Sequence, residues 1–211
     1  MDEKRESGDG GGFYRSSLCP SFLRILSSPE IRTVMVVGCG GGFDFVHSML
    51  LYPELRSVMK KRVVIGSFSF GSTRSIKLEV EEIEVEGLSK GAAKKVNATS
   101  EGPVDYCPEV GLCHHLDESF PQDAPHYVYA FSAREYTVPT LTTLYNKLIE
   151  RENVDCVIIF DGGSDSLMRG NETGLGDPVE DSVSVTTVAH LKGSVHLFLI
   201  LCPLDAKCVL H

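Results

Sequence analysis

Two glycine-rich segments hold the residue types in this chain that are best suited to chemistry. The first loop runs from Gly38 to Gly42 and is followed at once by a carboxylate. Because glycine has no side chain, backbone N–H groups in such a loop can approach a phosphate or carboxylate closely. We therefore predict ligand contacts from Gly38, Gly40, Gly41, Gly42 and Asp44. The alternatives are a tight turn without a ligand, and an aspartate that only complements the helix dipole.

The second loop runs from Asp161 to Gly176 and is rich in acids. Asp161 and Asp165 are candidate catalytic residues, because a carboxylate at a strand end can act as a general base or hold Mg²⁺. Arg169 is suited to gripping an anionic group with two hydrogen bonds. The predicted ligand contacts of this loop are Gly162, Gly163, Arg169 and Glu172. The alternative is a solvated loop that ends in a helix cap at Asp177.

Familiar nucleotide-binding motifs are incomplete in this sequence. The first loop lacks the Gly-Lys-Ser/Thr of a P-loop, and Phe43 stands at the third glycine position of the dinucleotide fingerprint. No acid follows the second predicted strand, where Gly66-Ser67-Phe68 stands. Three serines at or just past this strand, Ser67, Ser69 and Ser72, are candidates to line the same ligand site as the two loops. A methyltransferase that uses S-adenosylmethionine stays open as an alternative, on the appearance of the first loop alone.

Other reactive side chains have ordinary structural interpretations. Cys39 is interpreted as a small buried thiol rather than a nucleophile, and His47 as a helix residue rather than a catalyst. The cysteines and histidines between Cys107 and His115 lack the paired short spacings that are typical of zinc sites. None of these residues is therefore placed in the predicted site.

Apolar runs alternate with helical patterns along the chain, which predicts the elements that position both loops. Fully apolar, β-branched runs of this kind are typical of strands buried in a parallel sheet. The helical patterns include one that starts at Pro53, and one that starts at Pro139 and shows apolar residues at i, i+3, i+4 and i+7. The predicted strands are 31–37, 62–65, 78–85, 127–131, 154–160 and 195–202, and the remaining helices are 43–52, 108–116 and 179–192. For 78–85 the alternative is a short amphipathic helix.

This order predicts an α/β fold: a three-layer, Rossmann-like, mostly parallel sheet with helices on both faces. We expect residues 1–17 to form a disordered tail, 18–211 one domain, and 87–105 a mobile loop within it. Ligands of open parallel sheets bind beyond the carboxyl ends of the strands, and both loops follow such ends.

Composition narrows the classes of partner. A net charge of −9 without a basic stripe argues against nucleic acid, and no apolar run approaches the ~20 residues that span a bilayer. Seven cysteines at irregular spacings are typical of reduced thiols and predict a cytoplasmic location. The expected partner is a small-molecule ligand.

The segments VVGCGGGFDF and VDCVIIFDGGSDSLMRGNETGLGDPVEDSVSV are similar to the proteins grouped as domain of unknown function 1152. The resemblance covers about Ile31 to Val195 and implies that both loops form the family's characteristic surface. It implies no activity. Members of this family look longer than the present chain, which predicts a truncated end that leaves an apolar strand edge unpaired.

The function that these patterns favour is an enzyme acting on a phosphorylated or carboxylated metabolite or a nucleotide, with Mg²⁺ as a candidate cofactor. The alternatives are a non-catalytic binding protein of the same ligand class, the methyltransferase, and an inactive truncated product.

Overall fold

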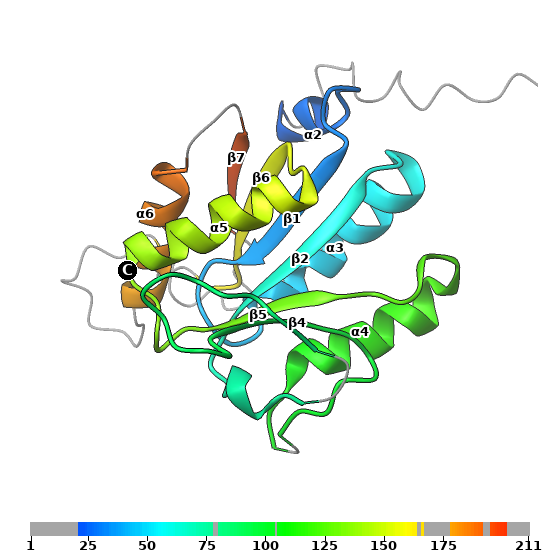
Figure 1. The fold of residues 1–211 in the computed structure, drawn as a ribbon. Coiled ribbons are helices and arrows are strands. Elements are labelled where there is room, and N and C mark those ends of the chain that lie inside the picture. The colour runs from blue at the N-terminus through cyan, green and yellow to red at the C-terminus, as the bar shows by residue number, and fades with distance from the viewer. Residues whose placement is uncertain are drawn as a thin grey trace, which may run out of the picture.

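A computed structural model describes residues 21–77, 80–103, 105–163, 166, 178–191 and 195–201. In these residues a seven-stranded sheet has the order β3-β4-β5-β2-β1-β6-β7 (Figure 1). The strands are β1 Thr33–Gly38, β2 Arg62–Ser69, β3 Glu81–Glu82, β4 Ala93–Val96, β5 Val128–Ser132, β6 Cys156–Asp161 and β7 His196–Leu201.

Five of these strands are parallel and lie in the order β5-β2-β1-β6-β7. Counted along the chain, this is the 3-2-1-4-5 order of the Rossmann fold, with β3 and β4 added antiparallel at one edge. The predicted Rossmann-like, mostly parallel sheet is confirmed. The strand order reverses between β1 and β6, which makes the gap between these two strands the topological switch point.

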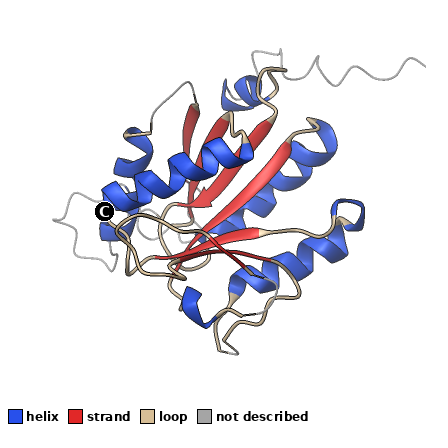
Figure 2. Ribbon diagram, viewed as in Figure 1, coloured by secondary structure: helices blue, strands red, loops and turns tan. Residues whose placement is uncertain are grey.

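Helices cover both faces of the sheet (Figures 1 and 2). On one face, Val34 and Val36 of β1 pack against Leu26 and Leu55, and the buried side chains of α4 pack nearby. The opposite face of β1 packs against the last two helices. The helices are α2 Ser21–Leu26, α3 Ser48–Pro53, α4 Pro108–Ser119, α5 Val138–Glu152 and α6 Pro178–Ala189, with shorter helical turns η1 Asp44–His47, η2 Glu54–Val58, η3 Thr73–Ser75 and η4 Pro121–Asp123.

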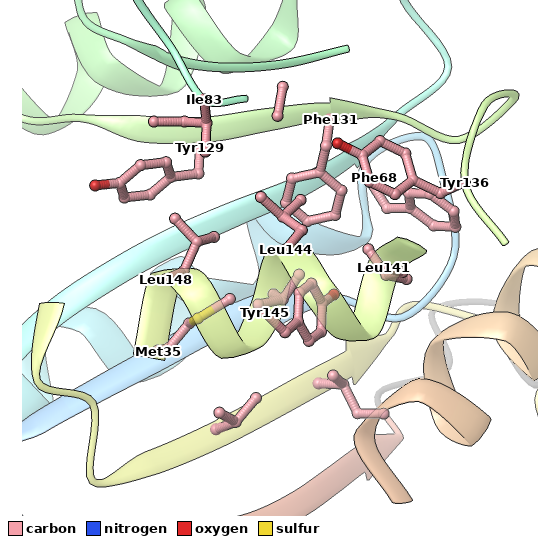
Figure 3. Packing of buried hydrophobic residues seen from close by; sticks show 14 of the residues in the cluster. Met35, Phe68, Ile83, Tyr129, Phe131, Tyr136, Leu141, Leu144, Tyr145 and Leu148 are labelled. Atoms are coloured by element: carbon pink, nitrogen blue, oxygen red, sulfur yellow. The ribbon is translucent and has the colours of Figure 1, made fainter. Parts of the chain in front are cut away.

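Helix α5 follows the predicted amphipathic pattern. Its side chains Leu144, Tyr145 and Leu148 are fully buried and point toward Met35 and its neighbours in the sheet (Figure 3). Burying each such side chain contributes about 1.5–3 kcal/mol. A capping box between Thr137 and Thr140 closes the first turn of the helix.

Two expectations about local structure were wrong. Pro53 was expected to open a separate helix, but it lies inside a helical run that extends from Asp44 to Val58. The run widens after the proline, where Met59 N donates to Glu54 O at 2.9 Å. Residues 87–105 were expected to form a mobile loop, yet residues 93–96 form β4, which pairs with β5. Of the expected strand 78–85, Glu81–Glu82 form β3, while residues 80 and 83–85 lie outside any strand.

Candidate functional site

Both glycine-rich loops begin at the switch point. Strands β1 and β6 are direct neighbours, and Gly38 at the end of β1 is in register with Phe160, one residue before the end of β6. The two loops therefore leave the same edge of the sheet side by side. In open α/β sheets this edge is where ligands bind.

Asp44 joins the two loops. Its Oδ2 accepts a hydrogen bond from Gly40 N at 2.9 Å, and its Oδ1 accepts one from Gly162 N at 3.2 Å. Burial raises the pKa of Asp44; the two backbone hydrogen bonds lower it in part, and the negative charge of Asp161 raises it further. The predicted ligand-binding carboxylate is thus a half-buried bridge between the loops.

Asp161 is buried at the end of β6, with 1% of its surface exposed. Its Oδ1 accepts from Gly163 N at 2.7 Å, and its Oδ2 accepts from Ser166 Oγ at 2.5 Å. The backbone amides of Gly40, Gly162 and Gly163 therefore already donate to carboxylates of the protein. A ligand anion at this edge would meet the two aspartates as well as the loop backbone.

Close packing accounts for the absence of side chains in the first loop. A Cβ atom at Gly40 would lie less than 3.0 Å from Asp181 Oδ1, and one at Gly41 would lie 2.7 Å from Phe70 Cδ1. Gly42 has a φ of +74°, which a residue with a side chain rarely adopts. Packing against the buried Asp181 favours glycine at position 40, and the positive φ favours it at position 42, whether or not a ligand binds. The exposed ring of Phe70 has room to move away from Gly41.

The structure adds two neighbours that the sequence did not indicate as site residues. Asp181 lies in the first turn of α6 with 4% of its surface exposed, and its carbonyl oxygen accepts from Cys39 Sγ at 3.9 Å. His47 stacks on Phe160 with ring centroids 6.5 Å apart and lies against Gly162. Its position in the chain could have indicated Asp181, because the first turn of a helix that follows a parallel strand faces the edge of the sheet where ligands bind.

An acidic side chain also lies at the end of β2, although the residues at this end of the strand in the sequence include no acid. Glu109, from the first turn of α4, accepts a hydrogen bond from Ser67 Oγ at 2.8 Å. Next to this pair, Ser69 Oγ accepts from the backbone N–H of Gly71 at 3.0 Å. The acid of this strand end thus comes from a helix 42 residues further along the chain.

Three predicted site residues, Asp165, Arg169 and Glu172, lie outside the described residues, as does Asp177. Within the described ranges, the histidine, cysteine, aspartate and glutamate side chains form no group of three or more that could hold a metal ion. Cys113 is buried and donates to Val96 O at 3.7 Å, and burial raises its pKa to about 12.

Residues 120–206 match the model of a family described as "Protein of unknown function (DUF1152)". The matched segment holds the second loop and the elements from β5 to β7, while the first loop lies before it. The resemblance to this family is therefore confirmed over that segment, and the description assigns no activity. No curated protein and no solved structure matches the chain. None of the helices in the described residues is long and apolar enough to cross a membrane.

Proposed function

We propose that the protein is an enzyme that acts on a small phosphorylated or carboxylated metabolite, nucleotides included, bound at the edge between β1 and β6. The observation that carries this proposal is the Asp44 bridge between the two loops. A partly desolvated carboxylate with a raised pKa, placed at a topological switch point, is typical of functional sites.

The charges at this edge favour a divalent cation as the partner of the anionic ligand. At about 4 Å, two like charges repel by about 4 kcal/mol for an effective dielectric constant of ~20. An anion beside Asp44 and Asp161 therefore needs a counter-charge. Mg²⁺ is commonly held by one or two carboxylates together with phosphate oxygens. We assign Asp161 the role of metal ligand or base, with Asp165, Arg169 and Glu172 as further predicted contacts.

The raised pKa suits Asp44 to proton transfer. A general acid or base works best when its pKa lies near the working pH, and burial moves a carboxyl group in that direction. In this proposal Asp44 exchanges a proton with the reacting group of the ligand, while the glycine backbone shapes the surface on which the ligand lies.

A thermal-shift screen tests the proposal with nucleotides, sugar phosphates, small carboxylates and S-adenosylmethionine, each with and without Mg²⁺. A ligand at 100 times its Kd adds about 2.7 kcal/mol of stability. For a chain of this length that raises the Tm by roughly 5–11 °C. A Mg²⁺-dependent shift with phosphorylated or carboxylated compounds is expected, and a shift with S-adenosylmethionine alone would support the methyltransferase instead.

Turnover of the hit compound is then followed by ³¹P NMR or by mass spectrometry. Asp161→Asn should abolish turnover and change the affinity by less than about tenfold. The matched control is Asp123→Asn, which removes a carboxylate paired with Arg56 near the opposite edge of the sheet. Unchanged turnover in Asp161→Asn would overturn the catalytic assignment.

A non-catalytic binding protein for the same ligands is the second candidate. It is favoured by the hydrogen bonds that hold both oxygens of Asp161 within its own loop, as in structural Asx turns. A wild-type chain that binds the hit compound and leaves it chemically unchanged would decide for this candidate.

A further inference from the structure

The end of β2 carries a buried acid with few partners. Glu109 exposes 1% of its surface and Ser67 exposes none. An ionised carboxylate offers about four acceptor positions on its two oxygens. Ser67 Oγ is the one donor that the described part of the chain offers to it, and it bonds to Oε1. A carboxylate held by this one bond keeps acceptor positions for further donors.

The side chain of Tyr106, which the charge of Glu109 affects, carries a hydroxyl left unsatisfied by the described residues. The hydroxyl of Tyr106 is enclosed and has no hydrogen-bond partner among the described residues. Burial raises the pKa of Tyr106, and the nearby negative charge of Glu109 raises it further. The β2-end cluster, defined as Ser67, Tyr106 and Glu109, therefore combines a buried carboxylate bonded to Ser67 with a hydroxyl that has no partner among the described residues.

This cluster adjoins the first loop. Gly66 is in register with Val37, so Ser67 is level with Gly38 on the neighbouring strand, about 4.8 Å away. The rings of Tyr106 and Phe43 are in edge contact, with centroids 6.0 Å apart. The β2-end cluster and the first loop are therefore neighbours at the carboxyl edge of the sheet.

We propose that Glu109 receives the two vicinal hydroxyls of a ribose ring, so that the ligand of this site is a ribosyl phosphate or a nucleotide. A vicinal diol supplies two donors, and a carboxylate held at one oxygen by Ser67 has acceptor positions left for both. In dinucleotide-binding sheets of this strand order, an acid at the end of the second strand binds the ribose hydroxyls. Here α4 supplies that acid. The inference rests on the proposed function and names its substrate class.

Calorimetric titration of the full chain, with Mg²⁺ present, compares AMP with 2′,3′-dideoxy-AMP and ribose 5-phosphate with 2-deoxyribose 5-phosphate. The wild-type chain should bind each hydroxylated compound about ten- to hundredfold more tightly than its deoxy partner. Glu109→Gln should reduce this ratio to within about threefold, since the amide replaces one acceptor by a donor. It should leave the affinity for 2′,3′-dideoxy-AMP, which lacks both hydroxyls, unchanged.

Two further variants keep the test decisive if Glu109→Gln folds poorly. Ser67→Ala removes the hydroxyl that orients Glu109 and should lower the same ratio. Glu150→Gln changes an exposed glutamate of α5 and should retain the full ratio. A deoxy partner that binds as well as its ribose compound in the wild type, or an undiminished ratio in Glu109→Gln, overturns the diol assignment.

The outcomes also separate this inference from the proposed function. Binding of phosphorylated or carboxylated compounds that lack ribose, without binding of the ribose compounds, overturns the role of Glu109 and leaves the site at β1 and β6 intact. Failure of every phosphorylated and carboxylated compound to bind a cooperatively folded chain overturns both.

Discussion

Replacing Gly40 by alanine measures how closely α6 packs on the first loop. A Cβ atom at this position would lie less than 3.0 Å from Asp181 Oδ1 and 3.2 Å from Asp44 Oδ2. Asp181 exposes 4% of its surface, so its carboxylate has little room to move away. Overpacking of this kind lowers the stability by about 1–3 kcal/mol. Alanine also reduces the backbone freedom of the unfolded chain, which stabilises the fold by only ~0.4–1 kcal/mol. We expect a net loss of about 1–2 kcal/mol.

For a chain of this length, a change of 1 kcal/mol shifts the Tm by about 2–4 °C, so Gly40→Ala should lower it by about 2–8 °C. The matched control is Gly111→Ala in α4, where an added Cβ meets no atom within 4 Å. Alanine favours a helix over glycine by about 0.5–1 kcal/mol, so this control should raise the Tm by about 1–4 °C. Calorimetry of both variants gives the comparison. A Gly40→Ala Tm equal to or above that of the wild type would refute the packing of Asp181 on this loop.

Three further predictions concern the body of the fold. Burial raises the pKa of Glu152, but hydrogen bonds from Tyr129 and an arginine outweigh it and hold that pKa below its ordinary value. Glu152→Gln should therefore cost about 2 kcal/mol in urea unfolding at pH 7, and the deficit should shrink as the pH falls below about 4. Tyr145→Phe removes an enclosed hydroxyl without a partner in the described residues and should stabilise by about 1 kcal/mol, whereas Tyr129→Phe should destabilise. Iodoacetamide at pH 8 should label Cys113 at least about tenfold more slowly than Cys107, as followed by peptide mass spectrometry, because burial raises the pKa of Cys113 to about 12.

Strands buried on both faces could be predicted from the sequence because burial leaves a continuous apolar run. Strands β1 and β6 have every residue buried, and both were recognised. Strand β4 was missed because it contains two adjacent lysines. Lys94 is buried and its Nζ donates to Ile76 O at 2.6 Å, while Lys95 lies over the ring of Tyr127. Lysine stems that pack on the sheet hide the alternation that a strand normally shows.

Only those parts of the candidate site that lie close together in the sequence could be predicted. The sequence indicated both loops and Asp44, since glycines and acids directly follow buried strands. It did not indicate that Asp44 would accept from Gly162, 118 residues away, or that Glu109 would stand at the end of β2. These pairings depend on strand order and helix placement, which local periodicity does not encode.

Hydrogen-exchange mass spectrometry with the compound that gives the largest thermal shift tests the central claim most directly, because it locates the ligand on the chain. Binding should slow exchange in the backbone after β1 and after β6, at residues 38–47 and 161–163, relative to the free protein. Protection confined to other surfaces, such as the groove of about 550 Å³ between Glu81 and Arg151, would contradict the assignment of the ligand site to the switch point.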